Sequence, residues 1–137
     1  MTTVTARGRY APDNVGAVWI TDSSGRFVKT LKTWGLRRLG NATAWQTASL
    51  GNNVDAVTGA TRQSHGPLQA TWNCTDVSHQ PVVNGSYTLN VTFAESDAIP
   101  FFSPPPIVAT VPFTKGAPAD VSGTGTPNFT GMHISLQ

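Results

Sequence analysis

The chain has 137 residues, a length that predicts a single domain spanning 1–137. Charged residues make up 12% and the net charge is +2, with no run of lysine or arginine, which argues against a nucleic-acid partner. The single cysteine excludes an internal disulfide, and no apolar run approaches the ~20 residues of a transmembrane helix. Abundant Thr, Ser, Asn, Gly and Pro instead favour short strands joined by turns.

The first half of the chain predicts a β-hairpin followed by an irregular insert. Segments 15–21 and 26–34 are rich in β-formers and flank a turn cluster that ends in Gly25. Between residues 35 and 50, apolar side chains recur about three to six apart, which favours a short helix within an otherwise irregular stretch. Residues 50–66 are polar, so we expect a loop there.

The second half predicts further strands. Period-2 alternation or β-rich composition places them at 68–74, 86–94, 107–114 and 129–136. Four prolines make 100–106 a loop, in which the Phe101-Phe102 pair is expected to plug one end of the fold, with an exposed contact for a partner as the alternative. The tail 116–137 is interpreted as a linker plus an extra C-terminal strand. About six to seven strands at this spacing predict an all-β immunoglobulin-like β-sandwich with a short helical insert, and a closed barrel is the structural alternative.

One motif resembles a known pattern. The stretch from Trp72 to Asp76, followed by 81–87, resembles the W-D-G-x-D, turn, x-V-P-x-G-x-Y pattern of flagellar hook-capping immunoglobulin-like domains. This chain departs from it by having Asn73-Cys74 where Asp-Gly is usual. Further matching stretches are 10–15, 19–20, 27–31 and 55–66. Together they are similar to a family of predicted periplasmic bacterial proteins of unknown function related to the hook-capping domains.

That resemblance covers roughly residues 10–115 and implies the fold and export of the protein. The expected location is therefore periplasmic or extracellular. Because Met1 leads straight into polar sequence, an exported chain would already have lost its signal peptide, and a cytoplasmic protein is the alternative.

The heptapeptide 55–61, Asp-Ala-Val-Thr-Gly-Ala-Thr, matches the D-x-x-[ST]-G-A-[ST] pattern of proteins that carry covalent flavin mononucleotide (FMN). In those proteins a separate flavin transferase, using FAD and a divalent metal, esterifies the last Thr hydroxyl with the flavin phosphate. The resemblance implies that Thr61 is the acceptor, with a recognition context of Asp55, Thr58, Gly59 and Ala60. The alternative is a tight structural loop in which Asp55 makes an Asx-type turn and Gly59 supplies a positive φ.

Other side chains near the motif in sequence would complete a flavin site. Phosphate charge would be neutralised by Arg37, Arg38 and Arg62. The indoles of Trp34 and Trp45 would stack on the isoalloxazine ring. His65 is included because it follows the motif by four residues. The histidines lack metal-ligand spacing, no residue is assigned a catalytic role, and the stretch 95–97 is interpreted as a solvated loop start.

Two classes of function follow. The first is an exported electron-transfer domain that receives FMN at Thr61 from a flavin transferase and exchanges electrons with a membrane redox partner or another protein. The second is a non-catalytic structural or protein-interaction module of a periplasmic or surface assembly. The tail 116–137 lies beyond the resemblance and would either complete this sandwich or pair with another subunit, giving a homo-oligomer through the C-terminal strand.

Overall fold

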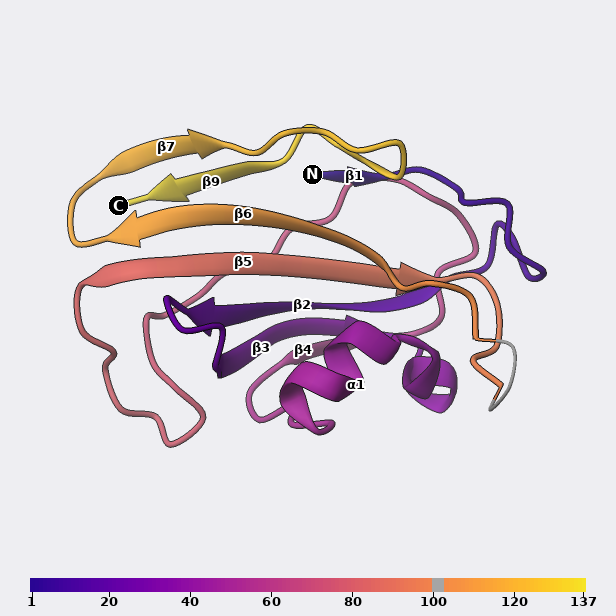
Figure 1. Ribbon diagram of the computed structural model, residues 1–137, viewed down its shortest axis with the longest axis horizontal. Helices are drawn as coiled ribbons and strands as arrows, with labels where there is room; N and C mark the ends of the chain where they lie inside the picture. The colour runs from indigo at the N-terminus through magenta and orange to yellow at the C-terminus, as the bar shows by residue number, and fades with distance from the viewer. Residues whose placement is uncertain (100–102) are drawn as a thin grey trace.

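The computed structural model describes residues 1–99 and 103–137 and contains two packed layers (Figure 1). The first layer is a five-stranded sheet with the order β4-β3-β2-β5-β6. Its strands are β2 (Val15–Asp22), β3 (Phe27–Trp34), β4 (Val57–Gly59), β5 (Gly85–Ala94) and β6 (Ile107–Lys115). The second layer holds two short pairs, β1 (Thr2–Thr3) with β8 (Phe129–Thr130) and β7 (Ala119–Ser122) with β9 (His133–Leu136). The all-β sandwich expected from the sequence is confirmed.

The predicted hairpin is the centre of the large sheet. Strands β2 and β3 pair antiparallel, with register shifts between Val18 and Trp19 and between Ile20 and Thr21. These irregularities explain why the polar and apolar residues of β3 do not alternate cleanly, because each bulge reverses the face on which the next side chain lies.

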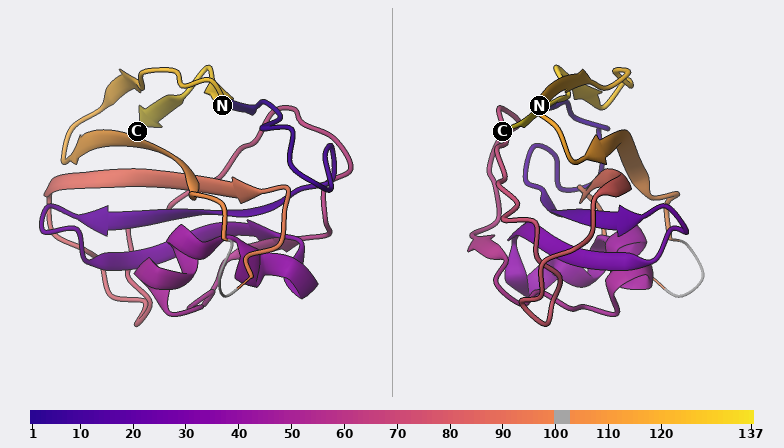
Figure 2. Two further views of the ribbon diagram at one scale, coloured as in Figure 1. Left: turned by 45° about the vertical axis from the view of Figure 1, so that its right-hand side comes forward. Right: turned by 90° about the vertical axis from the view of Figure 1, so that its left-hand side faces the viewer.

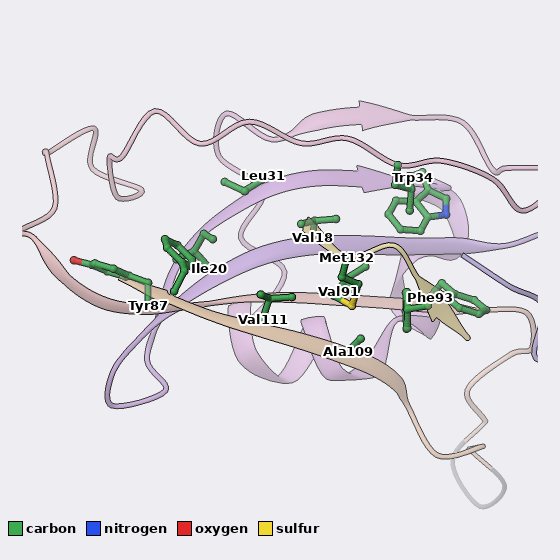
Figure 3. Packing of buried hydrophobic residues seen from close by; sticks show 13 residues of the cluster. Val18, Ile20, Leu31, Trp34, Tyr87, Val91, Phe93, Ala109, Val111 and Met132 are labelled. Atoms are coloured by element: carbon green, nitrogen blue, oxygen red, sulfur yellow. The ribbon is translucent and has the colours of Figure 1, made fainter. Parts of the chain in front are cut away.

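The core between the layers is built from alternate residues of the large sheet. Figure 3 shows Met132 of the C-terminal segment close to Val18 and Val91, with Ile20 nearer to Tyr87 in the same cluster. The other side chains of this core include Leu31, Trp34, Leu68, Tyr87, Ala109, Val111, Phe113 and Phe129. Met132 is buried in this cluster, so the tail that carries it is part of the sandwich core. Fully burying one such side chain contributes about 1.5–3 kcal/mol to the stability of the fold.

The helical insert covers the opposite face of the large sheet (Figure 2). It consists of a 3-10 helix η1 (Leu36–Asn41) and the helix α1 (Thr43–Ser49), which confirms the short helix expected after the hairpin. Trp19 of β2 alternates with the inward-facing residues and packs instead against Leu39 and Trp45. The indole Nε1 of Trp45 donates to Thr30 Oγ1 on β3 at 2.9 Å. The insert therefore turns the outer face of the sheet into a second small core.

The prediction of a strand at 68–74 is wrong. This segment packs against the core through Leu68 and Trp72, but it joins no strand ladder. The backbone N–H of Leu68 donates to Met1 O at 2.8 Å, next to a β1 that is only two residues long. At the other end Cys74 has φ 60, a left-handed conformation that interrupts an extended strand. Alternation here reflects the contacts of Leu68 and Trp72 with the core, while Ala70 between them is exposed, and it does not indicate a ladder partner.

The C-terminal region also differs in detail. Residues 116–127, expected to be a linker, include β7, which pairs antiparallel with β9. The strand expected at 129–136 is divided by Gly131, whose φ is 59. The Phe101-Phe102 pair expected to plug the fold lies outside the described residues.

Candidate functional site

The flavinylation-like heptapeptide lies at one edge of the large sheet. Strand β4 pairs in parallel with the end of β3, with Val57 opposite Lys32 and Gly59 opposite Trp34. Within 1–99 and 103–137, only β3 borders β4, so the other edge of β4 has no ladder partner there. Val57, Thr58, Gly59 and Ala60 are all exposed. The motif is therefore presented on an accessible edge strand and not inside the sandwich.

Asp55, the first residue of the motif, is tied to the sheet by a buried lysine. Lys29 on β3 has a side chain that is 4% exposed, and its Nζ donates to Asp55 Oδ2 at 3.1 Å. The same ammonium donates to Thr75 Oγ1 at 2.9 Å and to Asp76 O at 3.3 Å. His79 Nδ1 lies 2.9 Å from Asp55 Oδ2. A buried ammonium needs such partners, so Lys29 fixes the start of the motif.

The structure also changes the backbone interpretation of the motif. Asp55 has φ 59, whereas Gly59 lies in the β4 ladder and is not among the glycines with positive φ. The left-handed residue is thus the aspartate, a residue type that tolerates this conformation better than most. The expectation that Gly59 supplies the positive φ is wrong.

Thr61, the expected acceptor, lies just beyond the end of β4 and is half-buried. The backbone on both sides of it is fixed: Gly35 N donates to Gly59 O at 2.9 Å, and Arg62 exchanges two hydrogen bonds with Asn14 at 2.8 and 3.0 Å. Thr61 itself belongs to neither ladder. Its Oγ1 faces Gly35, where a Cβ would lie only 3.3 Å away. The hydroxyl therefore lies beside a residue that has no side chain.

Asn14 connects this loop to the core. It is fully buried, and its Nδ2 donates to Pro12 O at 3.0 Å and to Ser64 O at 3.3 Å. Its Oδ1 accepts from Trp34 Nε1 at 2.9 Å. Trp34 is 2% exposed and Trp45 is 1% exposed, so the expectation that these two indoles stack on a flavin ring is wrong. Trp34 instead stabilises the loop through its hydrogen bond to Asn14.

His65 contacts a buried carboxylate. Its Nε2 lies 2.5 Å from Glu95 Oε1, and its Nδ1 lies 3.0 Å from Thr3 Oγ1. Because an ionised carboxylate only accepts hydrogen bonds, Nε2 donates to Glu95 in this contact. Glu95 also accepts from the backbone N–H groups of Ala6 and Gly8, at 2.9 and 3.0 Å. Burial opposes the charge of Glu95, yet these hydrogen bonds together hold its pKa below the ordinary value.

Glu95 is 2% exposed, so the expectation of a solvated loop start is wrong at this residue. The neighbouring Asp97 is more exposed and belongs to a different cluster. The Tyr10 hydroxyl donates to Asp97 Oδ2 at 2.5 Å, and this bond is the main cause of a lowered pKa for Asp97. The same bond raises the pKa of Tyr10. Together the two carboxylates hold the N-terminal segment against the end of β5.

The arginines near the motif make contacts that do not include Thr61. Arg38 stacks over the Tyr10 ring at 3.9 Å and pairs with Asp97 at 3.4 Å. Arg62 Nη2 donates to Pro67 O at 3.5 Å, and its Nη1 is buried without a hydrogen-bond partner among the described residues. Arg37 is exposed. Of the sequence-predicted site residues, Asp55, Thr58, Gly59, Ala60 and Thr61 thus follow one edge, whereas Arg62 and His65 are directed to other neighbours.

Three supporting residues escaped the sequence analysis: Asn14, Lys29 and Glu95. Lys29 gave a signal, since a lysine between Phe27 and Leu31 interrupts an apolar strand face. Asn14 and Glu95 stand at strand ends in polar surroundings, where sequence pattern gives no sign of burial. Within 1–99 and 103–137, no three His, Cys, Asp or Glu side chains gather as a metal site, and no helix there has the length and apolarity to cross a membrane.

Fold and site together define a small all-β domain in which the heptapeptide 55–61 lies along one edge of the large sheet. The chain belongs to a family described as "Predicted periplasmic protein (DUF2271)", whose model matches residues 6–98, more than half of the chain. The predicted resemblance to a family of periplasmic proteins is thereby confirmed. Comparison with curated proteins and with solved structures gives no significant match.

Proposed function

We propose that this protein is an exported electron-transfer domain that carries FMN as a phosphate ester on Thr61, attached by a separate flavin transferase. The observation that supports this proposal most directly is the position of Thr61. Its side chain is half-buried, its backbone lies outside the ladders, and the motif residues before it are exposed on the edge of the sheet. An acceptor hydroxyl needs this combination of access and fixed position.

Attachment would replace one phosphate bond by another. The Thr61 oxygen would form a bond to the flavin-side phosphorus of FAD while the bond from that phosphorus to the AMP oxygen breaks. AMP is released, and the hydroxyl proton passes to a base of the transferase or to water. No electrons are transferred in this step. When bound, the flavin would supply the redox chemistry, while the protein positions it.

The residues of this chain would contribute position and access. The hydrogen bonds of Gly59 and Arg62 hold the backbone on either side of the acceptor. Gly59 and Ala60 have minimal side chains, which leave the outer edge of β4 open to a bulky donor molecule. Lys29 fixes Asp55 at the other end of the motif, four residues before Gly59. A transferase would thus meet the heptapeptide in one conformation and would not have to order it first.

The proposal is tested by producing the protein together with a flavin transferase in an exporting, FAD-supplied host and measuring its intact mass. The expected result is a gain of one FMN, with the yellow absorbance of flavin remaining after denaturation. Thr61→Ala removes the added mass. Ser64→Ala is the matched control, since it deletes an exposed hydroxyl three residues after the acceptor and outside the motif, and should leave the FMN in place.

Wild-type protein that stays unmodified in a host that flavinylates another acceptor would overturn the proposal. The non-catalytic interaction module would then be the better description. An FMN gain that survives in Thr61→Ala would instead refute the choice of acceptor, and peptide mapping of the modified residue would identify the true one.

A further inference from the structure

A cleft opens between the two layers at the end of the sandwich away from Thr61. Its volume is about 860 Å³, within the range of binding sites for molecules of moderate size. Its floor consists of side chains from four strands of the large sheet: Ile20, Leu31, Leu89 and Phe113. These four side chains make the floor apolar throughout.

Two main-chain segments form opposite walls of the cleft, and Asn84 and residues 115–118 complete its lining. One is 70–72 together with Cys74, from the extended segment that joins no ladder. The other is 133–137, which contains β9. Consecutive residues line the cleft on both sides, although side chains of an extended chain alternate between faces. The backbone edges themselves therefore face the cleft. Figure 2 shows the C-terminal strand and this extended segment on the same side of the molecule.

Both edges have unused hydrogen-bonding capacity. Strand β9 has β7 as its one ladder neighbour, so the edge of β9 that faces away from β7 is unpaired in the described part of the chain. No backbone group of Ala70, Thr71 or Trp72 enters a hydrogen bond with another described residue. Such facing edges are templates for an additional strand.

We propose that this cleft binds an extended peptide segment of a partner protein, which would add one strand between β9 and residues 70–72. Its backbone would pair with both walls, and alternate apolar side chains would point to the floor. No Asp or Glu lines the cleft, whereas Lys115 does, with its Nζ bonded to the neutral side chain of Asn84 at 2.7 Å. An acidic residue at that end of the peptide would pair with Lys115. This inference does not depend on flavin attachment.

A peptide fits these observations better than the other occupants. A compact apolar molecule would cover the floor but would leave the backbone groups of both walls without partners. In a second copy of this chain, every described strand of four or more residues is already paired within its own layer. A segment from a different protein has no such competing pairing to give up.

The test uses a synthetic, end-blocked heptapeptide of alternating valine and threonine that ends in glutamate. Amide chemical shifts and hydrogen exchange are followed by NMR in the full chain as the peptide is added. We expect saturable shifts at residues 70–72 and 133–136 together, and at least about tenfold slower exchange of these amides at saturation. A peptide of the same composition with proline at alternate positions cannot donate to a ladder and should have no effect.

Charge recognition is tested separately with the variant Lys115→Gln, at the last residue of β6. This change should weaken binding of the glutamate-ended peptide about threefold and leave that of a glutamine-ended peptide unchanged. Absence of shifts at millimolar peptide, shifts on one wall alone, or protection of the open edge of β4 instead would each overturn the proposal. Protection that appears on concentrating the protein without peptide would show that a second copy occupies the cleft.

Discussion

Replacing Glu95 by alanine should destabilise the protein far more than a surface charge change. The carboxylate is 2% exposed and accepts hydrogen bonds from Thr5, Ala6, Gly8 and His65. Hydrogen bonds to a charged acceptor contribute about 1.5–3 kcal/mol each, but Thr5 and Ala6 are exposed and water would replace their lost partner. The two remaining donors are Gly8 and His65, and losing their hydrogen bonds should lower the free energy of unfolding by about 3 kcal/mol.

The assay is thermal unfolding followed by circular dichroism. For 137 residues, each 1 kcal/mol corresponds to roughly 3–4 °C, so Glu95→Ala should lower Tm by about 10 °C. Asp120→Ala is the matched control, because that carboxylate is 72% exposed and its one ion pair among the described residues is with His133, across 3.4 Å. Its Tm should change by less than about 2 °C. A Glu95→Ala loss as small as that of the control would refute the reasoning.

The pH dependence of Glu95 gives a second readout. Its pKa is lowered in the folded protein, so its contribution to stability is complete above the ordinary glutamate pKa of about 4.3. That contribution disappears as the pH falls through the lower, folded-state value. The stability curves of wild type and Glu95→Gln should therefore converge as the pH falls below about 4. A difference that stays constant down to pH 2 would show that the charge of Glu95 contributes nothing.

Three further substitutions test the packing around the site. Gly35→Ala places a Cβ 2.2 Å from a valine methyl, at φ 79, and should lower the free energy of unfolding in chemical denaturation by more than about 3 kcal/mol. The control Gly25→Ala has φ 78 but lies in open space, so its loss should be about 1 kcal/mol. Equal losses for the two variants would contradict the close contact at Gly35. Trp45→Phe removes the indole bond to β3 and should lower Tm by about 5 °C, and an unchanged Tm would mean that the bond contributes nothing. Tyr10→Phe removes the hydrogen bond that is the main cause of the lowered pKa of Asp97. The pKa of Asp97 should therefore rise toward its ordinary value in a carbon-13 NMR titration, and an unchanged pKa would contradict this cause.

Much of the fold was accessible from sequence because local rules decide it. The hairpin of β2 and β3, the short helix that follows, and β5 all have periodicity or turn signals that the structure confirms. The segment 68–74 was misjudged because period-2 alternation does not indicate a ladder partner, and Leu68 and Trp72 here contact the core without a ladder. Strand β7 was not predicted because its four residues, 119–122, are too few for a pattern of alternation to be recognised within the stretch expected to be a linker. It forms through its tertiary pairing with β9.

The heptapeptide could be found from sequence, whereas its support could not. Its pattern identifies Thr61 without structural knowledge. The residues that hold it come from distant segments: Asn14 lies 48 positions before Arg62, and Glu95 lies 30 positions after His65. Trp34 and Trp45 were assigned to ring stacking from sequence proximity alone. Their burial is a consequence of tertiary packing on the two faces of one sheet.

Strand β4 is three residues long and outermost in its sheet, while the residue after Thr61 is bonded to fully buried Asn14. The two sides of Thr61 should therefore differ in how readily they open. Short edge strands detach with little free energy, whereas a backbone attached to the core moves only when the whole domain unfolds. We expect the amides of Val57 and Gly59 to exchange with solvent through small local excursions that leave Arg62 in place. Any enzyme that must reshape this loop would thus peel it from the β4 side, with Asn14 acting as the fixed end of a hinge.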